Sequence, residues 1–411
     1  MRRLVAGAFF FFLTACGSNG TTPSASPTST PTPAPTATPA IALAYSLQNG
    51  NEGSGPTGVI ALDGVLYGTT SAGGTGFQGT VFRFVPGAAK ATVLHSFTGV
   101  PDGQHSFGPP IAIDGALYGT TAYGGAAGRG TIFRIAPSGA GYQILYSFGA
   151  TPTDGVVPFA GLTGLNGTIY GTAAGGGTHN NGGTVFSIAP SGSAYTTLHD
   201  FGAGTDGKEP FAPLTASTGT LYGTTGYGGT YGCALYVECG TIFEIDTAGN
   251  ERVLHSFGKG GDGFGPQTGL LAAGGVLYGT TYAGGTTGNC HNGHGLAEHC
   301  GTVFSIATDG TKYAVLHDFG RGNDGMRPFG TLVMANGTLF GTTARGGKYG
   351  FGTVFAMSPD GSTYHVVYNF GASASDGQYP AGPLAAWENV IYGATQGGGA
   401  DGSGTIFAIT P

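Results

Sequence analysis

Beyond residue 40 the chain alternates between short runs of aliphatic, aromatic and β-branched residues and polar stretches rich in glycine, proline and aspartate. Short apolar runs of this composition, bounded by turn-forming residues, are typical of β-strands. The pattern therefore predicts a chain built from many short strands joined by tight turns.

Four kinds of run follow one another in a fixed order, strands a to d, and this unit repeats. Strand a has a proline followed four residues later by an aliphatic residue, and strand c has the motif G-T-[VI]-F. Strand b has the motif [LI]-[YF]-G-[TA]-[TA], with its aromatic residue at Tyr67, Tyr118, Tyr170, Tyr222, Tyr278, Phe340 and Tyr392. Strands a, b and c each occur seven times, but strand d, similar to L-[HY]-[SDN]-F, follows strand c only six times.

The seventh strand d lies at the other end of the chain. Residues 43–47 (Leu-Ala-Tyr-Ser-Leu) match it and precede the first strand a. Four strands in a repeat of about 50 residues are typical of a propeller blade, whereas a solenoid of the same units would leave open sheet edges. We therefore predict an all-β fold for residues 41–411, a seven-bladed β-propeller of four-stranded blades. The N-terminal strand completes the last blade and closes the ring.

The repeated unit LYGTT..GG..G.GTVF......LHSF resembles the gloeobacterial and verrucomicrobial (GloVer) tandem repeat of bacterial surface proteins. The resemblance covers residues 41–411 in seven in-phase copies. It implies no catalytic motif. A looser likeness to kelch blades, through double glycines such as Gly73-Gly74, concerns the fold alone, because a shared fold does not transfer a function.

Residues 1–15 are predicted to be a lipoprotein signal peptide. Arg2 and Arg3 precede an apolar run from Leu4 to Leu13, which is typical of an export signal and too short to span a bilayer. Leu13-Thr14-Ala15-Cys16 resembles the lipobox of bacterial lipoproteins, which implies that Cys16 is lipidated and anchors the protein to a membrane. An ordinary signal peptide and a twin-arginine signal are the alternatives.

Residues 16–40 are predicted to be the lipidated cysteine and an extended linker rich in Ser, Thr and Pro, because proline blocks helix and ladder hydrogen bonds. Gly17, rather than aspartate, follows the cysteine, which favours the outer membrane in a cell that has one. We therefore predict an exported protein, lipid-anchored in the bacterial cell envelope. The net charge of −7 and the lack of a basic cluster beyond Arg2-Arg3 argue against a nucleic-acid partner.

The b–c and d–a loops of such blades lie on one face of the ring. From the strand b aromatic residue to the glycine of strand c the spacing is 12 or 13 residues in five blades, but 18 in blade 4 and 23 in blade 5. Insertions on a rigid scaffold commonly carry binding residues, so this face is the candidate functional surface; drift in tolerant loops is the alternative. The blade 4 insertion contributes the aromatic residues Tyr231 and Tyr236.

The two insertions also hold four cysteines, Cys233 with Cys239 and Cys290 with Cys300. In an exported protein these pairs are predicted to form local disulfides. The alternative is a metal site, because the blade 5 cysteines lie among histidines that could add nitrogen ligands, namely His291, His294 and His299. Their spacing matches no common zinc pattern, so no metal is predicted.

An aspartate precedes glycine in the d–a loop of six blades, at Asp102, Asp154, Asp206, Asp262, Asp324 and Asp376. Asp-Gly is first of all a turn former; the alternatives are a calcium site or acid–base chemistry on the candidate face. In strand d, histidine and tyrosine share one position, which indicates packing or a shared hydrogen bond, at His95, His199, His255, His317, Tyr45, Tyr146 and Tyr368.

The sequence contains no serine-hydrolase elbow, phosphate loop or H-E-x-x-H motif. It therefore favours a monomeric binding or scaffold module, without a cofactor, whose b–c and d–a loop face engages a glycan or a surface protein. The alternative is a hydrolase or lyase with its site at the mouth of the central channel.

Overall fold

The computed structural model describes residues 39–411 except 49, 234–236, 287–289, 292–296 and 299, and gives only the backbone of residues 232, 233, 237, 238, 290, 291, 297 and 298. Thr38–Pro411 form one compact unit. Residues 1–38, with the predicted signal peptide and Cys16, lie outside the described part. Within that part, no helix is long and apolar enough to cross a membrane.

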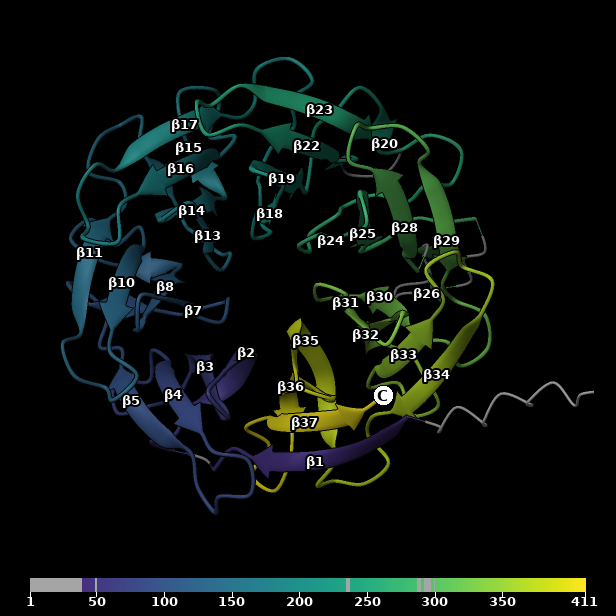
Figure 1. Cartoon of the computed structure of the whole chain (residues 1–411), viewed down its shortest axis with the longest axis horizontal. Helices are drawn as coiled ribbons and strands as arrows, with labels where there is room; N and C mark the ends of the chain where they lie inside the picture. The colour runs from purple at the N-terminus through teal and green to yellow at the C-terminus, as the bar shows by residue number, and fades with distance from the viewer. Residues whose placement is uncertain (1–38, 49, 234–236, 287–289, 292–296, 299) are drawn as a thin grey trace, which may run out of the picture. The chain divides into compact units, whose positions relative to one another are not determined.

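Seven antiparallel sheets surround a central axis, each with its first strand innermost (Figure 1). Blade 1 consists of β2 (Ser54–Leu62), β3 (Val65–Ala72), β4 (Thr80–Phe84) and β5 (Thr92–Ser96). Blade 2 consists of β7 (Ile111–Ile113), β8 (Ala116–Thr121), β10 (Thr131–Ile135) and β11 (Gln143–Ser147). Blade 3 consists of β13 (Thr163–Leu165), β14 (Thr168–Ala173), β16 (Thr184–Ile188) and β17 (Thr196–Asp200).

The remaining blades follow the same order from the axis outward. Blade 4 consists of β18 (Thr215–Ser217), β19 (Thr220–Thr225), β22 (Thr241–Ile245) and β23 (Glu251–Ser256), and blade 5 of β24 (Leu271–Ala273), β25 (Val276–Thr281), β28 (Thr302–Ala307) and β29 (Ala314–Asp318). Blade 6 consists of β31 (Val333–Ala335), β32 (Thr338–Arg345), β33 (Thr353–Met357) and β34 (Tyr364–Asn369), with β30 (Met326–Pro328) also paired to β32. Blade 7 consists of β35 (Gly377–Trp387), β36 (Val390–Gly398), β37 (Thr405–Thr410) and β1 (Ala40–Ser46).

The predicted closure of the ring is confirmed. β1 is the outermost strand of blade 7 and pairs antiparallel with β37, from Ala40 opposite Thr410 to Ser46 opposite Thr405 (Figure 1). The register shifts once within this pair, as it does between strands c and d of the other six blades. β1 therefore has the pairing of a strand d although it precedes every other strand.

Buried aromatic residues join neighbouring blades. The phenylalanine that follows strand d of one blade contacts the strand c phenylalanine of the next, and the ring centroids of Phe97 and Phe133 are 5.5 Å apart. The other pairs are Phe148–Phe186, Phe201–Phe243, Phe257–Phe304, Phe319–Phe355 and Phe370–Phe407. At the closure Leu47, which is 1% exposed, replaces the first phenylalanine and belongs to one cluster with Phe82. Burying each such side chain contributes roughly 2 kcal/mol.

The glycine of strand b is required by the phenylalanine beside it. Gly119 lies opposite Phe133, and a Cβ on Gly119 would come 2.5 Å from Phe133 Cζ. We expect Gly119→Ala to lower the free energy of unfolding by about 2 kcal/mol, because the fully buried ring has no space to move into. Urea unfolding measures the loss. The same change in a Phe133→Leu background should cost less, and an equal cost in both backgrounds would contradict the steric explanation.

Pairs of two-residue strands lie on one face of the ring. β6 (Gly103–Gln104) pairs with β9 (Tyr123–Gly124), and β12 (Gly155–Val156) with β15 (Gly175–Gly176). Each pair joins a d–a loop to a b–c loop, so these loops share a face as predicted. β20 (Gly232–Cys233) and β21 (Val237–Glu238), like β26 (Cys290–His291) and β27 (Ala297–Glu298), form hairpins inside the two insertions.

Candidate functional site

A cavity of about 540 Å³ lies on the ring axis, where the d–a loops lead into the innermost strands. All seven blades line it. One equivalent position in each blade contributes, with the residues Thr57, Phe107, Phe159, Phe211, Gln267, Phe329 and Ala381. The cavity is therefore on the face of the d–a and b–c loops, the surface that the loop lengths singled out.

The cavity wall is chemically asymmetric. Phe107, Phe159 and Phe211, from blades 2 to 4, form an aromatic wall in which successive ring centroids are 5.2 and 5.7 Å apart. Blades 1, 5 and 7 place smaller or polar side chains at the same position. Further hydroxyl and amide groups come from Thr268, Thr331 and Gln396. Blade 6 contributes a fourth phenylalanine, Phe329, so the aromatic rings are concentrated in blades 2 to 4 rather than confined to them, and the two amide groups come from blades 5 and 7.

We call the residue two positions before each of the seven equivalent lining residues, from Thr57 to Ala381, the rim position of its blade. Its φ is between 55° and 65° in all seven blades, at Gly55, His105, Val157, Glu209, Gly265, Arg327 and Tyr379. Its N–H donates to a carbonyl of the preceding blade, for example from Glu209 to Gly182 at 2.7 Å. This conformation favours glycine and is costly for a β-branched residue such as Val157. Five blades nevertheless keep a side chain there, and these side chains differ in size and charge.

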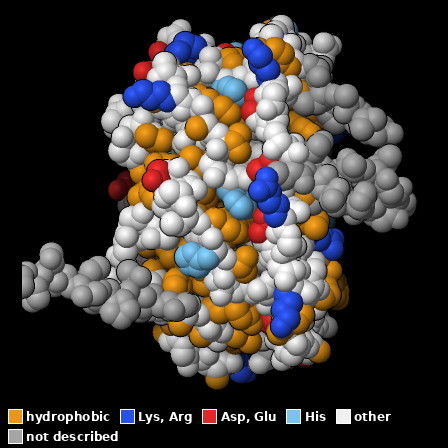
Figure 2. Space-filling view, turned by 90° about the vertical axis from the view of Figure 1, so that its right-hand side faces the viewer, with side chains coloured by type: hydrophobic (Ala, Val, Ile, Leu, Met, Phe, Trp, Pro, Cys, Tyr) orange, Lys and Arg blue, Asp and Glu red, His pale blue; other side chains and the backbone are white. Residues whose placement is uncertain are grey.

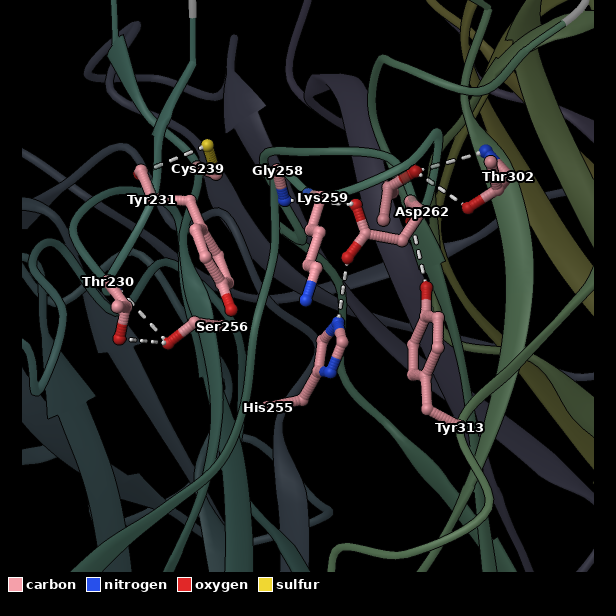
Figure 3. A network of polar contacts seen from close by, with 11 residues as sticks. Thr230, Tyr231, Cys239, His255, Ser256, Gly258, Lys259, Asp262, Thr302 and Tyr313 are labelled. Atoms are coloured by element: carbon pink, nitrogen blue, oxygen red, sulfur yellow. Dashed lines mark hydrogen bonds and ion pairs between the residues drawn. The ribbon is translucent and has the colours of Figure 1, made fainter.

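The predicted aspartates do not line the cavity; each joins its d–a loop to strand d in what we call a clamp, and Asp102 and Asp154 also accept from a tyrosine of the next blade. In the first clamp His95 Nε2 lies 3.0 Å from Asp102 Oδ2, and Tyr142 of the next blade donates to Asp102 Oδ1 at 2.6 Å. The His95 and Tyr142 rings stack at 3.6 Å. Figure 3 shows the clamp of blades 4 and 5, in which His255 contacts the Asp262 carboxylate and Tyr313 donates to the backbone carbonyl of Asp262 at 2.8 Å. Histidine side chains accordingly appear on the side wall of the ring (Figure 2).

All six carboxylates are occupied by donors of the protein itself. Each accepts a hydrogen bond from a backbone N–H of its own loop and contacts the histidine or tyrosine of strand d. The exchange of histidine for tyrosine therefore reflects a shared hydrogen bond, as the sequence indicated. Burial raises the pKa of Asp102, but hydrogen bonds from His95 and Tyr142 outweigh it and lower the pKa to about 2. The described residues contain no group of three His, Cys, Asp or Glu that could hold a metal.

A seventh clamp was not predicted from the sequence, because its carboxylate belongs to a glutamate and the other six belong to aspartates. Tyr45 of β1 donates to Glu52 Oε2 at 2.7 Å, and the Gln48 N–H donates to the same oxygen at 2.9 Å. Burial, together with the hydrogen bond to Glu52, raises the pKa of Tyr45 to about 12. Glu52 precedes a glycine and lies seven residues after Tyr45, the spacing of His95 and Asp102. That spacing was the signal that could have found it.

Glu251 replaces the clamp tyrosine between blades 3 and 4. It precedes Arg252 as Tyr142 precedes Gln143, and it lies beside His199, whose Nε2 is 3.1 Å from Asp206 Oδ2. Oε1 of Glu251 is buried and has no hydrogen-bond partner among the described residues. Burial raises the pKa of Glu251 to about 7; the charge of His199 opposes the rise, and the charges of Asp206 and Glu244 add to it. Glu251 therefore places a second buried carboxyl group beside the clamp of His199 and Asp206.

Glu251→Gln is expected to stabilise the protein at pH 8 by about 2 kcal/mol, allowing for the partial exposure of the site, and to have little effect at pH 4. The folded-state pKa lies above the unfolded value near 4.3, so the wild type loses stability as the pH rises from about 4.3 to 7. Glu251→Tyr, which can stack on His199, should stabilise further. Denaturant unfolding at both pH values tests this, and an equal effect of Glu251→Gln at pH 4 and pH 8 would disprove it.

The blade 4 and 5 insertions are described only in part. Tyr231 is exposed, with Lys259 Nζ 5.9 Å from its ring centroid and its carbonyl oxygen 3.3 Å from Cys239 Sγ (Figure 3). Cys239 and Cys300 are buried, and their carbonyls accept the rim N–H groups of blades 5 and 6. Both predicted disulfides stay predictions, because the structure does not describe the side chains of Cys233 and Cys290. The side chains of Tyr236, His291, His294 and His299 also lie outside the described part.

Comparison with known proteins yields a family and a fold. The family model described as the Gloeobacter/Verrucomicrobia repeat matches residues 54–293 and 290–411. No curated protein matches the sequence. A chain in a crystal structure of a nidogen/laminin complex is 16% identical, with a TM-score of 0.41, over 65% of this chain and 82% of that chain.

A second solved structure is the extracellular domain of a protein described as a one component system from B. thetaiotaomicron. It is 10% identical, with a TM-score of 0.55, over 89% of this chain and 40% of that chain. The present chain thus spans about two fifths of the length of that domain. At this identity the likeness concerns the propeller fold alone.

Proposed function

The chain belongs to the Gloeobacter/Verrucomicrobia repeat family, and we propose that it is an exported, lipid-anchored binding module whose axial cavity holds a glycan. The observation that carries the proposal is the asymmetric cavity wall, with three successive phenylalanines from blades 2 to 4 and the amide groups of Gln267 and Gln396 from blades 5 and 7. Export and anchoring rest on the sequence pattern that ends at Cys16.

A sugar ring has an apolar face and polar edges, and the cavity wall offers a partner for each. Its C–H face is apolar and stacks on a flat aromatic side chain, while the hydroxyl groups at its edge require hydrogen-bond partners. Phe159 lies between Phe107 and Phe211 and offers the stacking surface, and amide groups such as that of Gln267 both donate and accept. A volume of about 540 Å³ is within the range of small-molecule sites.

The chemistry of the wall favours binding over catalysis. Its described side chains are apolar, hydroxyl or amide groups, which hold and orient a ligand and are not acid–base catalysts near neutral pH. The hydrolase or lyase alternative needs a carboxylate or an imidazole that reaches the ligand. Rim residues such as His105 and Glu209 are the groups through which that alternative would have to act.

Binding of the full chain to a glycan array, followed by calorimetry on the glycans it retains, tests the proposal. Phe159→Ala is expected to weaken binding about tenfold or more, because it removes the centre of the aromatic wall. Phe77→Ala is the matched control, since Phe77 is 76% exposed in a b–c loop and does not line the cavity. Unchanged affinity of Phe159→Ala, or selective capture of a protein that both variants bind equally, would overturn the cavity proposal.

A further inference from the structure

Arg345 lies at the end of β32, on the face of the b–c loops. Its guanidinium carbon is 4.3 Å from the ring centroid of Tyr379, the rim residue of blade 7. Tyr379 also contacts Phe351, with ring centroids 5.4 Å apart, and lies two residues before Ala381 of the cavity wall. The tyrosine is thus held between blades 6 and 7 at the rim position, and the guanidinium of Arg345 stacks on it.

The charge of Arg345 is not neutralised within the described part of the chain. Its side chain is exposed and makes no ion pair with a described carboxylate, in a protein whose net charge is −7. A second guanidinium belongs to the same sheet but to its other face, because Met326 lies opposite Arg345 and the next residue, Arg327, points the other way. Arg327 is itself a rim residue and stacks 5.2 Å from the ring centroid of Tyr282. Blade 6 therefore presents the guanidinium of Arg345 at one sector of the rim, against Tyr379 of blade 7.

This sector faces the aromatic wall across the axis. The wall comes from blades 2 to 4, and in a ring of seven blades the sector of blade 6 lies on the other side (Figure 1). A ligand that uses both sides must carry an apolar face and, beyond it, an anionic group. Guanidinium groups bind carboxylate and sulfate oxygens through paired, charge-assisted hydrogen bonds, and stacking on tyrosine leaves the edge of the guanidinium free to make them.

We infer that the ligand is an acidic saccharide, with a sugar ring on the wall of Phe107, Phe159 and Phe211 and its carboxylate or sulfate on Arg345. The inference rests on the proposed function and narrows its ligand class. It also accounts for the rim position. A side chain there, rather than the glycine that the backbone favours, sets the size and chemistry that the rim presents in five of the blades.

The test compares a galacturonic acid oligomer with its methyl ester, in which each carboxylate is replaced by an uncharged ester carrying one added methyl group, using the full-length chain and calorimetry. The acid should bind about tenfold more tightly than the ester, and this difference should shrink as salt is added. Arg345→Gln should bind acid and ester equally. Lys90→Gln removes the same charge from an exposed c–d turn on the opposite face and should behave as the wild type. A sulfated oligosaccharide in parallel distinguishes sulfate from carboxylate as the anionic group.

Each outcome separates this inference from the proposed function. Equal affinity of the wild type for acid and ester, or an unchanged preference in Arg345→Gln, overturns the acidic ligand but leaves the glycan cavity standing. Failure of both carboxylate and sulfate probes to bind the wild type also overturns it. If Phe159→Ala leaves the affinity for every probe unchanged, the cavity itself is wrong.

Discussion

A chain that begins at Gln48, and so lacks β1, is expected to lose the cooperative unfolding transition of the propeller. The deletion removes β1 (Ala40–Ser46), the outer of the two antiparallel partners of β37, and so exposes β37 as a sheet edge. It also removes Tyr45 and Leu47 from the cluster that contains Phe82. Near-UV circular dichroism and a thermal scan measure the effect, with a chain that begins at Thr38 as the control.

A circular permutant shows whether β1 acts through pairing rather than through its place in the chain. Joining Pro411 to Pro39 by a short linker would make β37 and β1 a hairpin, since Thr410 and Ala40 are opposite one another. New termini between Gln48 and Glu52 would leave the blade 1 strands intact. We expect this permutant to unfold cooperatively near the wild-type Tm. A stable, cooperatively folded chain without β1 would show that closure is dispensable.

Asp154→Ala is expected to lower the free energy of unfolding by about 4 kcal/mol, the largest effect we expect from a single clamp residue. Asp154 is 5% exposed, and its carboxylate accepts from Tyr146 and Tyr195 at 2.8 and 3.1 Å. It also accepts the N–H groups of Gly149 and Ala150 at 2.8 and 3.1 Å. The substitution leaves four donors without their acceptor at the joint between blades 2 and 3. Denaturant unfolding measures the loss.

A double-mutant cycle assigns this loss to the clamp. Tyr195→Phe should lower the free energy of unfolding by about 1 kcal/mol in the wild type and by much less in the Asp154→Ala background. In that background the carboxylate that accepts from the Tyr195 hydroxyl is already absent. Asp360→Ala is the control, since that aspartate is exposed and contacts only Ser358 and Ser362. Equal costs of Tyr195→Phe in both backgrounds would show that the hydroxyl does not act through Asp154.

The fold could be predicted from the sequence because the order of the strand patterns within each repeat indicates which strands pair. Each strand is a short apolar run between turn residues, and the strand d pattern around Tyr45 has no strand c before it. In a ring that pattern has one partner, β37, which β1 indeed pairs with. The shared role of histidine and tyrosine in strand d could be inferred for the same reason, since seven copies of one position must satisfy one local geometry.

The candidate site could not be predicted in the same way, because its residues converge from positions about 50 residues apart. Phe107, Phe159 and Phe211 are unremarkable one at a time, and only the packing of consecutive blades brings their rings into a wall. The aspartates could be predicted only in part. Asp-Gly in six loops indicated turns, but their hydrogen bonds to strand d, and the cross-blade bonds of Asp102 and Asp154, depend on how the loops fold.

The sequence by itself thus determined the strands, their number, the closure of the ring and the face on which loops vary, because these depend on local patterns and on counting. Only the tertiary structure decided which side chains line the axis, that Glu251 Oε1 is buried without a described partner and where Arg345 meets Tyr379. The physical reason is that contacts between blades depend on the orientation of side chains from separate repeats, and no single repeat encodes that orientation.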